Sequence, residues 1–324
     1  MKLGFRKHPY ERMLHGGQKV EYLLETDSIT KRYGAITAVD HVSIHLKRGE
    51  IYGLIGRNGA GKTTLLKMLA GLAKPTEGSY RIFGESEEKT ASMRDRIGIL
   101  IESPGLFPSM NAMENMKIKS LMMGMNDEAF MRELLRDVGL EEVGKIPVKK
   151  YSMGMKQRLG IALSLLGHPD LLLLDEPING LDPQGIVEIR ELIARLSKER
   201  NITIMISSHI LEELSKIATR YSILHHGQMI EEFTHQELLK RCCERIELRP
   251  SDPVKACTVI ESMGITDYKV LDKSIIQIFE RLDDSGEIVL ELAKNNIKTL
   301  NIAVKNEALE DYYLSLTGDA RSVG

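Results

Sequence analysis

Residues 56–63 match the pattern GxxxxGK[ST], with Gly56, Arg57, Asn58, Gly59, Ala60, Gly61, Lys62 and Thr63 in order. A short apolar run at 51–55 precedes the motif, and a segment with helical apolar spacing follows it. In this context the glycines let backbone N–H groups approach a polyphosphate at a helix N-terminus. The lysine reaches the β- and γ-phosphates, and the threonine hydroxyl binds Mg²⁺. We therefore predict that 56–63, together with Thr64, binds a nucleoside triphosphate.

A second stretch, 171–177, reads Leu-Leu-Leu-Leu-Asp-Glu-Pro and predicts a buried strand that ends in two carboxylates. Asp175 stands at the strand tip, where a carboxylate suits Mg²⁺ binding through water. Because side chains alternate along a strand, we expect Glu176 to face the other way and to polarise an attacking water as general base. Beside a phosphate loop, this pair predicts hydrolysis of the bound nucleotide.

Strands and helices alternate around these two stretches. We expect strands at 42–46, 51–55, 80–83, 97–101, 171–174, 202–206 and 221–224, and helices at 63–72 and 184–199. Between about 110 and 167, helical spacing replaces the strand-like runs. This order predicts an α/β fold in which a helical insertion interrupts a mostly parallel sheet covered on both faces.

A second domain is expected from about residue 241. Its predicted elements are strand 245–249, helix 252–263, strands 268–271 and 274–279, helix 286–296, strand 299–304 and helix 308–316. The first six follow the βαββαβ order of a ferredoxin-like unit. This part carries no nucleotide motif, so a regulatory ligand site, a dimerisation platform and simple stabilisation stay open. We favour a dimer contact through 268–271 and 274–279.

The amino-acid composition argues against several classes of protein. The 324 residues suggest two domains, and no uncharged run approaches the roughly 20 apolar residues of a membrane helix. Lys and Arg total 44 against 46 Asp and Glu, which gives no general electrostatic case for binding nucleic acid. The three cysteines, Cys242, Cys243 and Cys257, argue against a disulfide framework or a zinc site and suit reduced cytosolic thiols. Residues 1–19 are expected to be a flexible basic lead-in without a secretory signal.

Further motifs resemble those of the ABC-type ATPases. Residues 151–158 resemble the family's signature motif, with Ser152, Met153, Gly154 and Met155 at its centre. Residues 179–182, which end in Asp182, resemble the D-loop; His209 resembles the switch histidine, and Tyr33 the aromatic that stacks on adenine. The resemblance covers about 20–233. It implies a P-loop ABC ATPase domain at 20–240 with a helical subdomain at about 110–167, and leaves 241–324 as a small α+β accessory domain.

The resemblance also implies a mechanism and partners. ATP would bind at Tyr33 and 56–64, with Mg²⁺ held by Thr63, Asp175 and the residue at position 102. Lys62, Glu176 and His209 would be catalytic. Two subunits, identical or different, would pair head to tail, so that the signature of one meets the ATP of the other and Asp182 couples the two sites. A membrane-spanning permease would hold the protein at the inner, cytoplasmic face of the membrane, and no nucleic acid is expected.

Position 102 departs from the family pattern. Glu102 stands where the family usually has Gln, in the stretch Ile-Glu-Ser-Pro-Gly at 101–105. A carboxylate cannot donate a hydrogen bond as an amide does, but it is a stronger Mg²⁺ ligand. We expect closure around ATP to depend more strongly on Mg²⁺. This form resembles the ATPases of bacitracin and lantibiotic export or immunity systems, which implies export of a peptide antibiotic or other drug-like substrate and antibiotic resistance.

Three kinds of function compete with export: a soluble ATPase acting on DNA or ribosomes, a non-hydrolysing paralogue, and the ATPase of an importer. A soluble ABC ATPase acting on DNA would need a long coiled-coil insertion between Lys62 and Ser152, and only about ninety residues lie there. Ribosome-acting relatives generally resemble two ATPase domains in tandem, and here there is one. A non-hydrolysing paralogue fits poorly with Lys62, Asp175 and Glu176. The ATPase of an importer is a nearer rival, against which the neighbourhood of position 102 and the short C-terminal domain favour export.

Methionines crowd the helical insertion, and methionine adapts to irregular surfaces. They are Met110, Met113, Met116, Met122, Met123, Met125 and Met131. For each alone, core packing is the simpler interpretation, but together they predict a groove near 107–123 that receives a short helix of the membrane subunit. His225 and His226 end a predicted strand, so we expect them to face opposite ways and to bind no metal.

Overall fold

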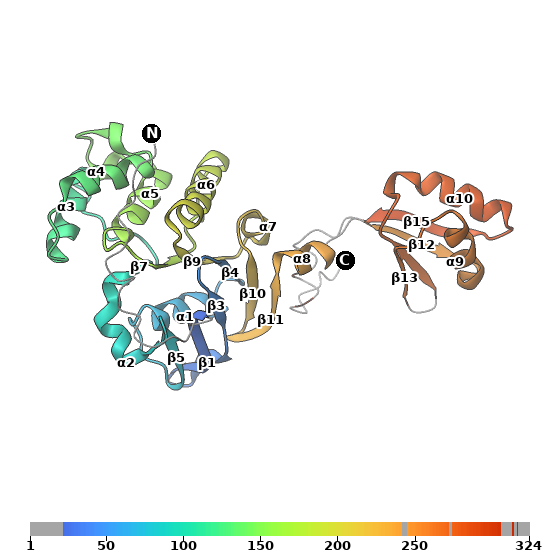
Figure 1. Cartoon of the computed structure of the whole chain (residues 1–324), viewed down its shortest axis with the longest axis horizontal. Coiled ribbons are helices and arrows are strands. Elements are labelled where there is room, and N and C mark those ends of the chain that lie inside the picture. The colour runs from blue at the N-terminus through green and yellow to red at the C-terminus, as the bar shows by residue number, and fades with distance from the viewer. Residues whose placement is uncertain (1–21, 242–244, 272–273, 306–312, 314–315, 317–324) are drawn as a thin grey trace, which may run out of the picture. The chain divides into compact units, whose positions relative to one another are not determined.

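The computed structural model describes residues 22–241, 245–271, 274–305, 313 and 316. The predicted lead-in at 1–19, Cys242, Cys243 and most of the predicted helix 308–316 lie outside them. The chain divides into two compact units (Figure 1). One runs up to Ser208 and includes Leu224–Met229, and the other contains His209–Ile223 and the chain from Ile230 onward. The domain boundary expected near 240 stays a prediction.

A six-stranded sheet carries both nucleotide motifs, in the order β11-β10-β4-β9-β8-β7. The strands are β4 (Ile51–Ile55), β7 (Ile97–Leu100), β8 (Leu171–Asp175), β9 (Thr203–Ser208), β10 (Arg220–His225) and β11 (Gln228–Thr234). β4, β9, β8 and β7 pair in parallel. Every residue of β4, β8 and β9 is buried, which explains their nearly continuous apolar runs. Parallel pairing brings the loop after β4 and the acidic end of β8 to the same edge.

A second, antiparallel sheet was not anticipated from the sequence. It contains β1 (Tyr22–Tyr33), β2 (Ile36–Val42), β3 (His45–Lys47), β5 (Glu77–Ile82) and β6 (Glu85–Ser86). The expected strand 42–46 is split between β2 and β3, which both pair with β1. The expectation of a mostly parallel sheet is therefore right only for the central sheet. Alternation of apolar and polar residues indicates that one face of a strand is buried, but it does not indicate which strand pairs with it.

One core joins the two sheets of the first unit. It brings residues of the antiparallel sheet, such as Leu24 and Ile44, together with Leu65 and Leu69 of α1 (Lys62–Leu69) and with Leu173 of β8. Helix α1 is thus anchored along its buried face by residues from both sheets. Burial of several leucines at about 1.5–3 kcal/mol each fixes where its first turn lies.

The predicted helical insertion is present. It contains α3 (Ala112–Met122), α4 (Glu128–Asp137) and α5 (Met153–Ser164), which lie together in Figure 1, and no described residue between 110 and 167 is in a strand. Asn111 and Asp127 cap α3 and α4. Outside the insertion, α2 (Glu87–Thr90) precedes β7, and α6 (Pro183–Arg200) follows β8. Arg200 at the end of α6 pairs with Glu133 and Asp137 of α4, which ties the insertion to the sheet domain.

Besides most of β10 and β11, the described part of the second unit contains four α-helices and a four-stranded sheet. Its elements are α7 (Leu211–Ser215), α8 (His235–Arg241), β12 (Arg245–Pro250), α9 (Pro253–Ser262), β13 (Tyr268–Leu271), β14 (Ile275–Ile278), α10 (Ser285–Lys294) and β15 (Thr299–Lys305). From β12 on they follow the predicted βαββαβ order, and the antiparallel sheet runs β13-β14-β12-β15. Ile246 and Leu248 of β12 pack with Ile260 and Ile288 of α9 and α10 in a core of their own.

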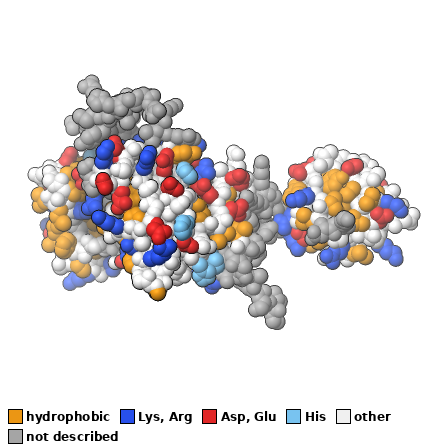
Figure 2. Space-filling view, turned by 90° about the horizontal axis from the view of Figure 1, so that it is seen from below, with side chains coloured by type: hydrophobic (Ala, Val, Ile, Leu, Met, Phe, Trp, Pro, Cys, Tyr) orange, Lys and Arg blue, Asp and Glu red, His pale blue; other side chains and the backbone are white. Residues whose placement is uncertain are grey.

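Acidic and basic side chains are both present on the surface. Figure 2 shows acidic and basic side chains interspersed on the face in view, in keeping with a formal charge of −2. None of the described helices is both long and apolar enough to span a membrane. Cys257 in α9 is a free thiol.

Candidate functional site

The phosphate loop follows β4 and is shaped by its glycines. Gly61 adopts φ 104° as the N-cap of α1, and a Cβ there would lie 2.3 Å from the Ala38 carbonyl oxygen. At Gly56 a Cβ would lie 2.5 Å from the carbonyl oxygen of Leu224. Both positions exclude any larger residue, because backbone blocks the side chain. The motif's glycines are therefore required by the chain's own packing, before any nucleotide is considered.

The first turn of α1 joins the loop to the acidic end of β8. The Lys62 side chain is only 5% exposed, and its Nζ donates to the Gly56 carbonyl at 2.5 Å. The same Nζ lies 3.1 Å from Glu176 Oε1. The Thr63 hydroxyl donates to Asp175 Oδ2 at 2.7 Å. The two motifs, more than a hundred residues apart in the chain, thus meet as predicted.

The expected alternation of Asp175 and Glu176 is wrong. Both carboxylates reach the first turn of α1, Asp175 to Thr63 and Glu176 to Lys62. The reason is that the strand ends at Asp175, and Glu176 adopts φ 47°, in the left-handed region. This conformation costs a non-glycine residue roughly 1–3 kcal/mol and is held only where the surroundings require it. It turns the Glu176 side chain back to the side of the loop.

A serine that the sequence analysis missed holds the acidic pair in place. Ser207 is fully buried on β9, directly opposite Asp175 in the parallel register. Its hydroxyl donates to Asp175 Oδ1 at 2.6 Å and accepts from the Glu176 backbone N–H at 2.9 Å. The signal was present in the sequence: 207–208 is a polar pair that closes an otherwise apolar strand.

Glu102 stands at the end of the neighbouring strand. Leu100 of β7 pairs with Leu174 of β8, so Glu102 lies at the level of Glu176 beyond the strand ends. It too adopts a left-handed φ, 63°, and its side chain is 64% exposed. Its Oε1 accepts from Lys67 Nζ of α1 at 2.5 Å. This hydrogen bond raises the pKa of Lys67 above its usual value.

The signature and D-loop residues cap helices. The Ser152 hydroxyl accepts from the Met155 backbone N–H at 3.2 Å at the start of α5, and Asp182 accepts from the Gly185 N–H at 3.1 Å at the start of α6. Both hydrogen bonds stay within their own helix ends and do not reach the phosphate loop. Met153 is exposed, and a Cβ on Gly154 would come no closer than 3.9 Å to its surroundings. Among the described residues, none therefore requires glycine at 154.

Tyr33 and His209 are the remaining residues predicted to serve the site. Tyr33 ends β1 with half of its side chain exposed, and Lys31 Nζ lies 5.0 Å from its ring centroid. One ring face of Tyr33 is thus engaged by a cation. His209 is exposed directly after β9 and belongs to the second compact unit.

The histidine pair does not behave as predicted. The rings of His225 and His226 lie 4.1 Å apart between centroids, so they do not face opposite ways. His226 adopts φ 46°, which ends the strand geometry on which the expectation depended. Among the described residues, no three His, Cys, Asp or Glu side chains cluster closely enough to hold a metal ion by themselves.

The methionines divide between core and surface. Met116 and Met131 are buried, so they pack the insertion and are not available to a partner. Met122, in contrast, is 77% exposed, and Leu121 and Phe107 are also exposed. The exposed side chains predicted to serve a partner thus come from the loop after β7 and the end of α3.

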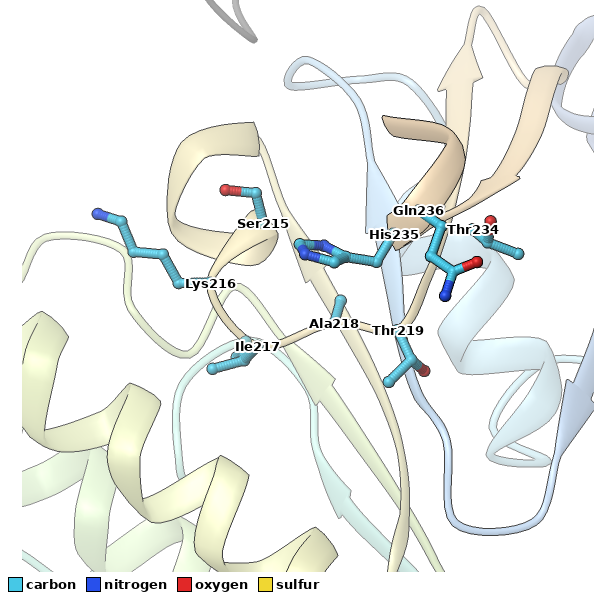
Figure 3. A pocket seen from close by; sticks show the side chains of 8 residues that line it. All are labelled: Ser215, Lys216, Ile217, Ala218, Thr219, Thr234, His235 and Gln236. Atoms are coloured by element: carbon cyan, nitrogen blue, oxygen red, sulfur yellow. The ribbon is translucent and has the colours of Figure 1, made fainter. Parts of the chain in front are cut away.

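The second unit has a pocket of about 530 Å³. It is lined by Ser215, Lys216, Ile217, Ala218, Thr219, Thr234, His235 and Gln236 (Figure 3). At its wall the Tyr221 hydroxyl donates to the Ala218 carbonyl at 2.7 Å, so its contact of 2.9 Å with His235 Nδ1 requires that nitrogen to carry the proton. None of the residues predicted to bind ATP lines this pocket.

Comparison with known proteins agrees with these motifs. The sequence profile of the ABC transporter family matches residues 39–179. The bacitracin transport ATP-binding protein BcrA of Bacillus licheniformis is 44% identical over 299 residues, which cover 91% of this chain and 97% of that protein. This chain belongs to the ABC transporter ATP-binding proteins. As an ABC ATPase, it binds ATP and hydrolyses it in a transport-coupled cycle.

Three further proteins resemble this chain over about two thirds of its length. The lantibiotic transport ATP-binding protein SrtF of Streptococcus pyogenes is 45% identical over 210 residues, 65% of this chain and 90% of that protein. Among solved structures, cbiO1 of Clostridium perfringens, part of an ABC transporter complex, superposes with a TM-score of 0.63 at 27% identity over 68% of this chain and 91% of its own. A dimeric cassette, MJ0796, bound to ADP and phosphate, gives a TM-score of 0.59 at 26% identity over 65% of this chain and 98% of its own.

Proposed function

We propose that this ABC ATPase powers the export of a peptide antibiotic of the bacitracin or lantibiotic kind and so gives resistance to it. The observation that carries the proposal is the likeness to the bacitracin transport protein along nearly its whole length. Glu102 adds support, since the stretch Ile-Glu-Ser-Pro-Gly around it resembles that of bacitracin and lantibiotic ATPases. The first compound to test is therefore bacitracin, followed by a lantibiotic.

In the proposed site, ATP lies along the phosphate loop with its adenine on the open face of Tyr33. Mg²⁺ would be held by Thr63, Asp175 and Glu102, whose hydroxyl and carboxylate oxygens are the donors that this ion prefers. When bound, Mg²⁺ offsets the negative charge of the β- and γ-phosphates. The buried bond from Ser207 fixes Asp175 for this task.

The Lys62–Glu176 ion pair suggests how ATP binding would affect Glu176. Lys62 Nζ pairs with Glu176 and donates to the Gly56 carbonyl. A triphosphate is the stronger partner for the ammonium, because it carries more charge, so Lys62 turns to it. Glu176 would then accept a proton from the attacking water, with His209 assisting.

The proposed active form is a head-to-tail dimer. The open surroundings of Gly154 and the exposed Met153 leave room for the γ-phosphate of a partner's ATP at the start of α5. Asp182, which caps α6, would couple the two sites. The solved cassette MJ0796 is dimeric, which supports pairing of two such subunits. The two copies can be identical or different.

The proposed partner is a membrane-spanning permease, which would hold the chain at the cytoplasmic face of the membrane. The exposed Phe107, Leu121 and Met122 are the surface that we assign to it. Burial of these three side chains would contribute several kcal/mol to docking, at about 25 cal/mol per Å² of apolar surface.

Co-purification tests this proposal. A tagged Glu176→Gln variant, which should trap the ATP-bound state, is isolated from native membranes in mild detergent. We expect a multi-span protein in stoichiometric amount, and a Met122→Glu variant should lose it while an exposed polar change such as Lys149→Glu does not. Cells that lack the chain should also be more sensitive to bacitracin. A chain that comes down without any membrane protein, or that brings ribosomes or DNA, would contradict the transporter role.

A further inference from the structure

Three side chains of helix α1 each contact a carboxylate at or just beyond the ends of β8 and β7. Lys62 meets Glu176 at 3.1 Å, Thr63 meets Asp175 at 2.7 Å, and Lys67 meets Glu102 at 2.5 Å. Lys67 follows Thr63 by four residues, so both side chains leave the same face of the helix. The nucleotide motif accounts for the first two contacts. The third is outside every motif and has no role assigned to it.

Charge explains why Glu102 needs a partner. Glu102, Asp175 and Glu176 stand at the ends of two adjacent strands, where a triphosphate with several negative charges has to bind. Like charges placed close together, and close to the phosphates, repel one another. A glutamate in place of the family's glutamine therefore adds repulsion unless a cation lies beside it. Lys67 is that cation.

The backbone conformation at Glu102 is a second reason why this residue needs a partner. Glu102 adopts a left-handed φ of 63° beyond the last residue of β7, and its side chain is mostly exposed. An exposed side chain has many rotamers, and only a few aim the carboxylate at the start of α1. The hydrogen bond from Lys67 selects one of these. It holds Glu102 beside the helix that carries Lys62 and Thr63.

We propose that Lys67 is a positioning residue that holds the Glu102 carboxylate beside α1 and yields it to the metal when Mg²⁺–ATP binds. The proposal rests on the proposed role of Glu102 in Mg²⁺ binding. Lys67 thus competes with Mg²⁺ for one carboxylate. Its loss makes Glu102 available at lower Mg²⁺ concentration, whereas loss of the carboxylate has the opposite effect.

The test measures binding of a fluorescent ATP analogue to the full chain across a Mg²⁺ titration, without hydrolysis. In Lys67→Met we expect the half-saturating Mg²⁺ concentration to fall roughly 1.5- to fivefold, the range of an exposed ion pair. Lys67→Arg keeps the charge and should remain near the wild type. Glu102→Gln should raise the half-saturating concentration. Lys74→Met, which removes an exposed cation just beyond the same helix, is the matched control for net charge.

The double variant Lys67→Met/Glu102→Gln separates positioning from plain charge. With no carboxylate to hold, removal of Lys67 should add no more than the Lys74→Met control does. Far-UV circular dichroism shows that each variant is folded. If Glu102→Gln shifts the Mg²⁺ dependence but Lys67→Met behaves as Lys74→Met, the positioning role is wrong and the proposed site stands. If Glu102→Gln itself shifts nothing, the role of Glu102 in the proposed site is wrong, and this inference with it.

Discussion

Two glycines of the phosphate loop provide a matched pair for testing how the loop is built. Gly59 and Gly61 both have positive φ, 83° and 104°, so alanine is strained at either position. They differ in space, since a Cβ on Gly59 meets nothing within 4 Å, whereas one on Gly61 would lie 2.3 Å from the Ala38 carbonyl oxygen. Gly59→Ala therefore carries the strain alone, about 1–2 kcal/mol. Gly61→Ala adds an overpacking cost of about 1–3 kcal/mol.

Urea denaturation of the nucleotide-free chain, followed by far-UV circular dichroism, measures this difference. Each unit has its own hydrophobic core, so the transition of the unit that contains Ile246 and Leu248 serves as an internal reference. We expect only the transition of the other unit to move, by about 1–3 kcal/mol more for Gly61→Ala than for Gly59→Ala. ATP binding should be lost with Gly61→Ala, because the start of α1 has to shift. Equal destabilisation by the two substitutions would refute the packing of the loop against β2.

Three further predictions concern single side chains. Lys62→Met removes the ammonium from the phosphate loop, and equilibrium dialysis should show ATP affinity about tenfold lower or more, since a bond to a charged group is worth about 1.5–3 kcal/mol. Ser207→Ala takes a buried donor from Asp175 and should lower the unfolding free energy by roughly 1–3 kcal/mol in thermal denaturation, whereas an unchanged Tm would mean that this bond stabilises nothing. Although burial opposes it, hydrogen bonds from Lys305 and two further side chains lower the pKa of Glu247, so its stabilising contribution is present above about pH 4.5 and is lost as the pH falls. Glu247→Gln should flatten the acid denaturation profile of its unit, and an unchanged profile would contradict this.

The nucleotide motifs were predictable because their chemistry depends on short stretches of chain. The pattern at 56–63 and the acidic strand end at 175–176 both occur in the context that the sequence indicated, and the structure joins them through Lys62 and Thr63. The central strands were found for a related reason. Strands buried on both faces appear as continuous apolar runs, and these stand out without knowledge of their neighbours.

What the sequence did not predict depends on long-range pairing or on single backbone angles. Alternating polar and apolar residues in a strand do not indicate which other strand it pairs with. The sequence therefore placed β2, β3 and β5 in a mostly parallel sheet, whereas they belong to the antiparallel one. The orientation of Glu176 was wrong because one left-handed residue cancels strand alternation. Ser207 acts only through its register with Asp175, and this register is set by the whole sheet.

A mixing experiment tests the central claim, that each ATP site is completed by a second copy of the chain, most directly. Lys62→Met disables the phosphate loop of one copy, and Gly154→Asp blocks the signature of the other, where the structure leaves room for a side chain. Each variant alone should hydrolyse almost no Mg²⁺–ATP. In a head-to-tail pair of the two, one site combines an intact loop with an intact signature, so the mixture should regain hydrolysis. A mixture as inactive as its components would contradict the shared site.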